Sequence, residues 1–174
     1  MPKTKFNMIR DQILDSEQTL QKIRRIAFEI YEQNFEETDI VLAGIAGQGY
    51  ELAQRLAKEL KSISPINPVV LKIDLDKTQP FRNPQPHSFD KSSYLNKTVV
   101  VVDDVLNTGR TLVFGLLPFV EVPVKRLQVA VMVNRGHHRY PVSADYIGYS
   151  LSTTLNEHVA VILSDETTLG VYLR

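Results

Sequence analysis

Two adjacent carboxylates, Asp103 and Asp104, follow an unbroken aliphatic run in the segment VVVVDDVLNTGRT, residues 99–111. In open parallel sheets, ligands bind at the carboxyl ends of the strands, so acids at this point can face a ligand. Ionised carboxylates only accept hydrogen bonds and are hard oxygen ligands, which suits sugar hydroxyls or Mg²⁺. They cannot hold a phosphate, because like charges repel. Paired acids alone also occur where a strand ends in a solvated turn.

The turn after the acids carries the residues Asn107, Thr108, Gly109, Arg110 and Thr111. Together they supply successive backbone N–H groups, two threonine hydroxyls and a glycine at the start of a predicted helix. A chain cradles a phosphate group in this way. Acids for a sugar beside amides for a phosphate indicate a site for a sugar phosphate.

The elements that must position these residues alternate along the chain. Four short and nearly continuous aliphatic runs are typical of parallel strands that are covered on both faces. Helical spacing of apolar residues precedes the first run and resumes after it. This alternation predicts an α/β sheet. The predicted strands cover residues 40–45, 68–73, 99–102 and 127–133, and the first helix covers residues 15–34.

Two helices show features of their own. In the first, Asp15 and Gln18 form a plausible N-terminal cap, and Leu20, Ile23, Ala27 and Ile30 recur at helical spacing. The helix after Thr111 meets prolines at positions 118 and 123, so we expect it to be short or kinked near position 117.

Composition narrows the class of protein. A chain of 174 residues with 43% hydrophobic content predicts one domain over residues 1–174. Lys and Arg balance Asp and Glu at 20 each, which argues against a global basic field for nucleic acid. The absence of cysteine excludes thiol chemistry and fits a reducing compartment. No apolar run resembles a signal peptide or a membrane span, so we expect a cytoplasmic protein.

The complete run of residues 99–111 resembles the signature of type I phosphoribosyltransferases, in which a hydrophobic strand leads to two acids and a T-G-x-T turn. The resemblance implies binding of 5-phosphoribosyl-1-pyrophosphate (PRPP). Asp103 and Asp104 would face the ribose hydroxyls and would bind Mg²⁺ directly or through PRPP or water, and residues 107–111 would hold the 5-phosphate. It also implies an open, twisted, mainly parallel sheet with helices on both faces, plus a small hood.

By the same resemblance, the turn after the first strand lies where the family has its pyrophosphate loop. Its residues Ala46, Gly47, Gln48 and Gly49 are therefore substrate-binding candidates. The family often has a strained cis peptide here, and Ala46-Gly47 is its expected place. An ordinary glycine-rich turn between a strand and a helix is the alternative.

A long polar segment, residues 74–97, occupies the family's position for a lid that closes over PRPP and excludes water. We expect the lid at about 75–97. Its basic residues Lys77 and Arg82 join Asp103 and Asp104 as catalytic candidates. An inert surface loop is the alternative.

The segment VAVMVNRGHHRYPVSADYIGYSLSTT, residues 129–154, is similar to the bifunctional pyrimidine operon attenuator and uracil phosphoribosyltransferase family. This likeness implies transfer of the phosphoribosyl group to a nucleobase, a pyrimidine such as uracil before others. Asn134, Arg135 and residues 147–151 become base-side candidates. The N-terminal segment and residues at about 134–155 would form the hood, and a homo-oligomer is expected.

The chain also departs from that family. The first loop lacks Lys and Arg at positions 46–48, and the lid has LDKTQPFR, residues 75–82, where the family has a Tyr-Arg-Asp-Asp run. Asn134 stands where the family tends to have Asp, and Asn107 stands where purine-salvage relatives have Asp. Because the diphosphate half of the site has lost basic residues, we expect PRPP to be bound more effectively than it is turned over.

Two other functions remain open from the sequence. One is a nucleotide-sensing, RNA-binding transcriptional regulator with weak or no transferase activity, for which Lys22, Arg24 and Arg25 would be the basic patch. The zero net charge disfavours RNA, since phosphate contacts need clustered basic residues. The other is a receiver-like domain that uses Asp103 and Asp104 for Mg²⁺, which leaves the T-G-R-T turn unexplained.

Overall fold

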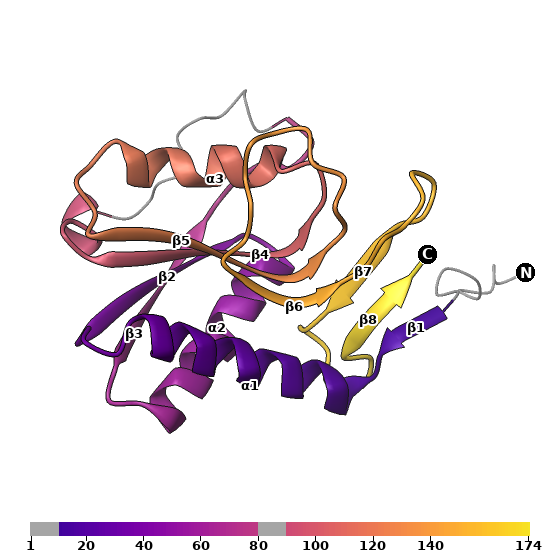
Figure 1. Cartoon of the computed structure of the whole chain (residues 1–174), viewed down its shortest axis with the longest axis horizontal. Coiled ribbons are helices and arrows are strands. Elements are labelled where there is room, and N and C mark those ends of the chain that lie inside the picture. Colours follow the sequence, from indigo (N-terminus) through magenta and orange to yellow (C-terminus); the bar gives the residue numbers. More distant parts are fainter. Residues whose placement is uncertain (1–10, 80–89) are drawn as a thin grey trace, which may run out of the picture.

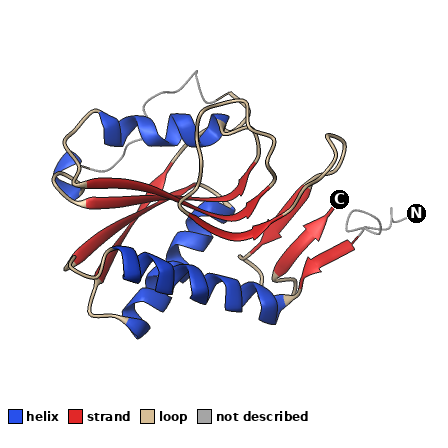
Figure 2. Ribbon diagram, viewed as in Figure 1, coloured by secondary structure: helices blue, strands red, loops and turns tan. Residues whose placement is uncertain are grey.

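The computed structural model describes residues 11–79 and 90–174. Five strands form one sheet in the order β3-β2-β4-β5-β6, and every neighbouring pair is parallel (Figure 2). Each predicted strand is present, and all four are longer than the aliphatic runs. The strands of this main sheet are β2 (Asp39–Ile45), β3 (Asn67–Ile73), β4 (Thr98–Leu106), β5 (Arg126–Asn134) and β6 (Tyr146–Ser150).

Helices cover both faces of the main sheet. Helices α1 (Ser16–Gln33) and α2 (Gln48–Ile63) lie on one face, and α3 (Arg110–Val120) lies on the other (Figure 1). This arrangement confirms the predicted α/β fold. No helix within residues 11–79 and 90–174 is long and apolar enough to cross a membrane.

A second sheet lies beside the main one. It is antiparallel, with the order β1-β8-β7, and consists of β1 (Asp11–Leu14), β7 (Val159–Ile162) and β8 (Gly170–Leu173). Hereafter these three strands are called the hood sheet. The strands β7 and β8 were not expected from the sequence. The hood was expected partly at residues 134–155, but most of the strand structure there is β6, which pairs with β5 in the main sheet.

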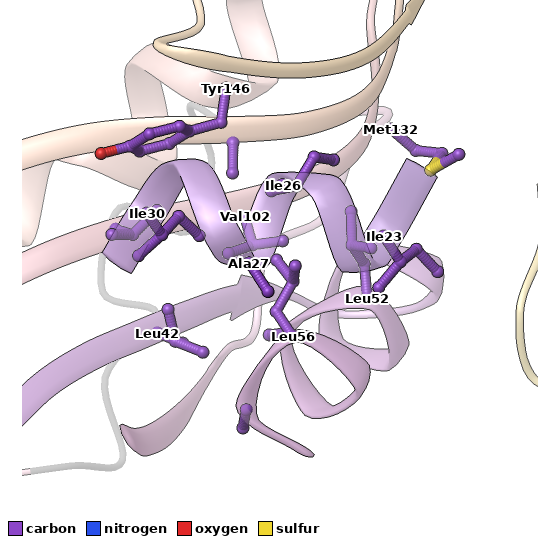
Figure 3. Packing of buried hydrophobic residues seen from close by; sticks show 14 of the residues in the cluster. Ile23, Ile26, Ala27, Ile30, Leu42, Leu52, Leu56, Val102, Met132 and Tyr146 are labelled. Carbon is purple, nitrogen blue, oxygen red and sulfur yellow. The ribbon is translucent and has the colours of Figure 1, made fainter. Parts of the chain in front are cut away.

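The alternation of side chains along the strands builds two cores. On β2, Ile40 and Leu42 face α1 and α2, whereas Val41, Ala43 and Ile45 belong to the cluster that includes α3. Figure 3 shows the first cluster, where isoleucines of α1 meet leucines of α2 over the sheet. Successive aliphatic residues are therefore all buried, which explains the unbroken runs in the sequence.

The first helix confirms the predicted cap and corrects its apolar face. The Asp15 side chain accepts from Gln18 N at 2.8 Å, and the Gln18 side chain accepts from Asp15 N at 3.0 Å. Leu20 was expected on the buried face, but it is 41% exposed, and Thr19 is buried in its place. The Thr19 hydroxyl can be buried because it donates to Asp15 O at 2.7 Å.

Two further expectations concern proline and the polar loop. Pro118 lies inside the last turn of α3, and the helix ends two residues later, so the helix is short as predicted. Within the predicted lid, the segment of residues 90–97 packs against the core through Tyr94. Tyr94 is 1% exposed, and its ring meets that of Phe119 edge to face at 4.9 Å. Tyr94 therefore anchors the C-terminal part of the predicted lid segment to the core.

Candidate functional site

The two acids lie inside β4 and not after it, because the strand continues to Leu106. Since β2 and β4 are neighbours, the start of α2 is brought directly against Asp103. A Cβ atom at Gly49 would lie 2.9 Å from Val102 O and 3.0 Å from Asp103 Oδ1. Only glycine allows the helix N-terminus to approach the acid this closely. The first loop and the paired acids therefore form one site.

Asp103 is nearly inaccessible, with 2% of its side chain exposed, whereas Asp104 is 20% exposed. Burial raises the pKa of Asp103 to about 7, and the neighbouring charge of Asp104 adds to this effect. The ammonium group of Lys77 opposes the shift. The Oδ1 atom of Asp103 also accepts from Asp104 N at 2.9 Å. The pair thus carries less than two full negative charges near neutral pH.

Lys77 of the predicted lid lies directly over the acids. Its Nζ donates to Asp103 Oδ1 at 2.9 Å and to Asp104 Oδ1 at 3.2 Å. Partial burial acts to lower the pKa of Lys77, but the two carboxylates outweigh it and hold this pKa above its ordinary value. The lysine is therefore charged at neutral pH and neutralises the acids in the ligand-free protein. Arg82, the other basic candidate, lies outside the described residues.

The predicted phosphate loop lines a small cavity of about 30 Å³ beside Asp103. Gly109 takes a left-handed conformation with φ of 89°, which turns the chain into α3. The Thr108 hydroxyl accepts from Arg110 N at 3.3 Å, and its carbonyl accepts from the backbone N–H groups of Arg139 and Tyr140. The loop is thereby held from both sides. The cavity is lined by Asp103, Val105, Leu106, Asn107, Thr108, Gly109, Thr111 and Leu112.

The first loop differs from the expectation in two ways. The Ala46-Gly47 peptide is trans, not cis as expected, and Gly47 makes the turn with φ of 94° and ψ of −138°, angles that a glycine adopts without strain. The N–H of Ala46 donates to Ile73 O at 2.9 Å and so belongs to the sheet edge. The N–H groups that remain for a ligand are those of the first turn of α2, which have no intrahelical acceptors.

The Gln48 side chain points toward the hood sheet. Its Oε1 accepts from Leu163 N at 2.7 Å, and its Nε2 donates to Ser164 Oγ at 3.1 Å. Leu163 and Ser164 directly follow β7. In this structure, Gln48 therefore contributes its backbone to the first loop and its side chain to the hood contact.

Four of the base-side candidates, Asn134, Arg135, Ser150 and Leu151, lie together at the ends of β5 and β6, whereas residues 147–149 lie within β6 and do not line the same hollow. Asn134, Arg135, Gly136, Ser150, Leu151 and Ser152 line a hollow of about 240 Å³. The Asn134 side chain accepts from Gly136 N at 3.1 Å. Arg135 is buried, at 9% exposed, and its guanidinium donates to Asn107 Oδ1 at 2.9 Å. Thr153, which accepts from Arg135 Nε at 2.8 Å, was not among the residues expected from the sequence.

The basic patch expected for RNA makes contacts within the chain. Arg24 Nη1 lies 2.9 Å from Glu59 Oε2, and Arg25 Nε lies 3.3 Å from Glu29 Oε1. Together with Lys22, these residues lie on α1, and their acidic partners come from α2 (Glu59) and from the next turn of α1 (Glu29). The cluster is therefore partly neutralised.

Comparison with known proteins decides the family. The phosphoribosyl transferase domain matches residues 10–165. The chain belongs to this family. It is 34% identical over 164 residues to the "Bifunctional protein pyrR" of Enterococcus faecalis, covering 91% of this chain and 92% of that protein. It is 38% identical over 163 residues to the "Bifunctional protein PyrR" of Bacillus pumilus, covering 88% of this chain and 90% of that protein. The predicted resemblance is confirmed.

Solved structures of this phosphoribosyltransferase fold agree with the architecture. The hypoxanthine phosphoribosyltransferase of Trypanosoma cruzi superposes with a TM-score of 0.77 at 16% identity, covering 95% of this chain and 96% of that one. A hypoxanthine-guanine phosphoribosyltransferase of Bacillus anthracis gives a TM-score of 0.69 at 19% identity, covering 84% and 85%. At these identities the likeness supports the fold alone.

The buried carboxyl of Asp103 predicts a pH-dependent cost to stability. Its pKa of about 7 lies above its ordinary value of 3.8, so the folded protein binds this proton more tightly than the unfolded chain. Its contribution to stability is therefore greatest below pH 4 and declines as the pH rises toward 7. Asp103→Asn, which keeps an acceptor for Lys77, should raise the free energy of unfolding at pH 8 by about 1 to 4 kcal/mol.

Urea denaturation of both proteins at pH 4.5, 6 and 8 measures this difference. The gain in the variant should grow across the series. A variant that is less stable than the native protein at pH 8 would contradict the account of Asp103.

Proposed function

We propose that this phosphoribosyltransferase binds PRPP through Asp103, Asp104 and the loop 107–111, and transfers its phosphoribosyl group to a pyrimidine base, uracil before others. The single observation that carries the proposal is that the buried Asp103, with Asp104 beside it, lies next to the phosphate loop. Asp103 itself lines the cavity formed by that loop. Acceptors for ribose hydroxyls and donors for the 5-phosphate are therefore adjacent.

In the proposed reaction, a base nitrogen displaces pyrophosphate from ribose C1 through a transition state with positive charge on the sugar. No covalent nucleophile from the protein is needed. Thr108 and Thr111 anchor the 5-phosphate, and the two acids orient the ribose. The protein contributes mainly by aligning the two substrates and excluding water while charge separates.

Mg²⁺ is proposed as the metal that accompanies PRPP. Carboxylate oxygens are ligands that Mg²⁺ prefers, so the acid pair fits this ion. Among residues 11–79 and 90–174, no group of three or more His, Cys, Asp or Glu side chains converges on one point. We therefore propose that PRPP oxygens and water complete the coordination, which makes the contact of Asp103 and Asp104 with the ion partial or indirect.

Lys77 is proposed to change partners when PRPP binds. In the ligand-free protein it pairs with both acids, at 2.9 and 3.2 Å. The ribose hydroxyls need those same carboxylate oxygens, so PRPP must displace the ammonium group. Once released, Lys77 becomes the cation nearest to the diphosphate, where the first loop offers only backbone amides. Arg82 is proposed to assist it.

The choice of uracil rests on the relatives named bifunctional protein PyrR and pyrimidine operon regulatory protein. Asn107 supports it, since an amide cannot serve as an acidic partner for a purine nitrogen. The second name also favours another function, regulation of a pyrimidine operon, for which an RNA-binding role was expected from the sequence. The ion pairs of Arg24 and Arg25 weaken that alternative for this surface. A cytoplasmic location and a homo-oligomeric state belong to the proposal as well.

PRPP binding can be tested at Asp104. Asp104→Asn removes a charged acceptor for a ribose hydroxyl and should weaken PRPP binding by about 1.5 to 3 kcal/mol in calorimetry with Mg²⁺. Asp39→Asn is the matched control. Asp39 is the first residue of β2 and lies at the amino ends of the strands, away from Asp104, so this change should leave the affinity for PRPP unchanged. If the native protein does not bind PRPP, the proposal fails.

The base can be tested with a panel of uracil, hypoxanthine and guanine, each supplied with PRPP and Mg²⁺. We expect the largest kcat/KM with uracil. Faster turnover with either purine would reverse the assignment of the base while leaving the PRPP site intact.

Turnover should be weak relative to binding, because charge on the leaving diphosphate develops most in the transition state. In single-turnover assays with uracil, we expect a native rate below roughly 1 per second, the lower end of ordinary enzyme rates. Lys77→Ala should lower that rate by roughly 100-fold and change PRPP affinity far less. Lys125→Ala, which breaks an ion pair with Glu37 at the other end of the sheet, is the control.

An ordinary native rate of roughly 1 to 1000 per second would show that the missing basic residues are not needed. An unchanged rate in the Lys77 variant would remove this lysine from the mechanism.

A further inference from the structure

Arg135 is a charged residue in an unusual setting. It is 9% exposed and lies just after β5, and its backbone N–H donates to Leu106 O at 3.0 Å. Its guanidinium donates from three nitrogens. Nη1 reaches Asn107 Oδ1 at 2.9 Å, Nε reaches Thr153 Oγ1 at 2.8 Å, and Nη2 reaches Thr154 O at 3.2 Å and also Glu157 O. One side chain thus joins two segments that are far apart in sequence.

Stability alone does not explain this residue. The four acceptors of the guanidinium are neutral oxygens, and no carboxylate within residues 11–79 and 90–174 lies within 4.0 Å of it. The carboxylate of Glu157, whose pKa is lowered first by its hydrogen bond from Thr154 N and also by the charge of Arg135, attracts the guanidinium from beyond that distance. Burial of the cation still costs free energy that an apolar side chain would avoid. The geometry of the contacts therefore suggests a functional reason for keeping the charge.

The two segments that Arg135 joins belong to the two halves of the site. Asn107 lines the small cavity of the phosphate loop, whereas Arg135 itself lines the 240 Å³ hollow at the end of β5. Residues 153–157 lead into the hood sheet. The turn is closed by Thr154 N donating to Glu157 Oε2 at 2.7 Å, and the next residue, His158, exchanges backbone hydrogen bonds with Arg174 after β8.

The contact also fixes the orientation of the Asn107 amide. A guanidinium has only donors, so the amide oxygen must face Arg135 and the NH₂ group must face the other way. A lysine could not replace this arrangement, because its single ammonium group cannot reach acceptors on both segments with the planar geometry of the guanidinium. The phosphate loop and the 153–157 turn are therefore held in one relative position.

We propose that Arg135 is a positioning residue that couples binding in the phosphate loop to binding in the hollow beside it. This inference rests on the proposed function and assigns to Arg135 the coupling between the two halves of that site. A ligand that orders Asn107 fixes the guanidinium, and the fixed guanidinium in turn holds the 153–157 turn in place for the second ligand. By thermodynamic linkage, a base in the hollow must then strengthen phosphate binding by the same factor.

The test uses two ligands that cannot react with each other, ribose 5-phosphate and uracil, with hypoxanthine in place of uracil if the base panel favours it. Calorimetry gives the affinity for ribose 5-phosphate with and without saturating base. The ratio of the two affinities is the coupling factor, for which we expect roughly 5 to 150 in the native protein. Loss of a direct contact to either ligand lowers an affinity but leaves this ratio unchanged.

Two variants break the connection at different points. Arg135→Lys keeps the charge and loses the planar contacts. Thr153→Val is nearly isosteric and removes one acceptor of Arg135, although Thr153 lines neither cavity. Both should reduce the coupling factor to about one. Thermal unfolding checks that each variant is folded. If Arg135→Lys is not folded, the coupling factor of Thr153→Val alone decides the test.

The outcomes separate the inference from the function on which it rests. A native protein that binds no ribose 5-phosphate overturns both. A native protein that binds both ligands without coupling, or folded variants that keep the native coupling factor, overturn the role of Arg135 and leave the proposed function standing.

Discussion

The close approach of α2 to Asp103 is the constraint on which the site depends. Parallel pairing of β2 with β4 sets the height at which α2 begins, and Gly49 leaves no side chain between the helix and the acid. The same contact excludes water from Asp103 and raises its pKa. A helix N-terminus, a buried acid and a phosphate loop are thereby assembled at one edge of the main sheet, where open α/β sheets bind ligands.

In the ligand-free protein, the charges of Asp103, Asp104 and Lys77 balance one another at this end of the sheet. Two adjacent carboxylates would repel each other, but burial protonates Asp103 in part and Lys77 neutralises the remainder. On the proposed function, the ammonium group that the ribose hydroxyls displace from the carboxylates would then face the negative charge of the diphosphate. The stability lost by keeping Asp103 buried is typical of a site selected for binding and not for folding.

Much of the fold could be predicted from the sequence, because buried parallel strands leave unbroken aliphatic runs. The small strands could not be. β7 and β8 have four residues each, which is too short for a periodic signal. The prediction of a buried Leu20 was wrong, because the elements packed against α1, and not the periodicity of its sequence, determine which of its residues are buried. Thr19 satisfies its hydroxyl locally and so could take the buried position.

The sequence points to the candidate residues but not to the contacts between them. Asp103, Asp104 and the loop 107–111 were found from a contiguous motif. The contacts of Lys77 with the acids and of Arg135 with Thr153 depend on how the chain returns across the sheet, which no local pattern encodes. The turn at Gly47 likewise could not be predicted in detail, because the backbone freedom of glycine permits more than one turn.

The most direct test of the account is a crystal structure of the protein with uridine 5′-monophosphate. The account predicts the phosphate against the N–H groups of residues 107–111, the ribose hydroxyls on Asp103 and Asp104, and Lys77 displaced from both carboxylates. A nucleotide bound elsewhere, or bound with Lys77 still paired to the acids, would contradict it.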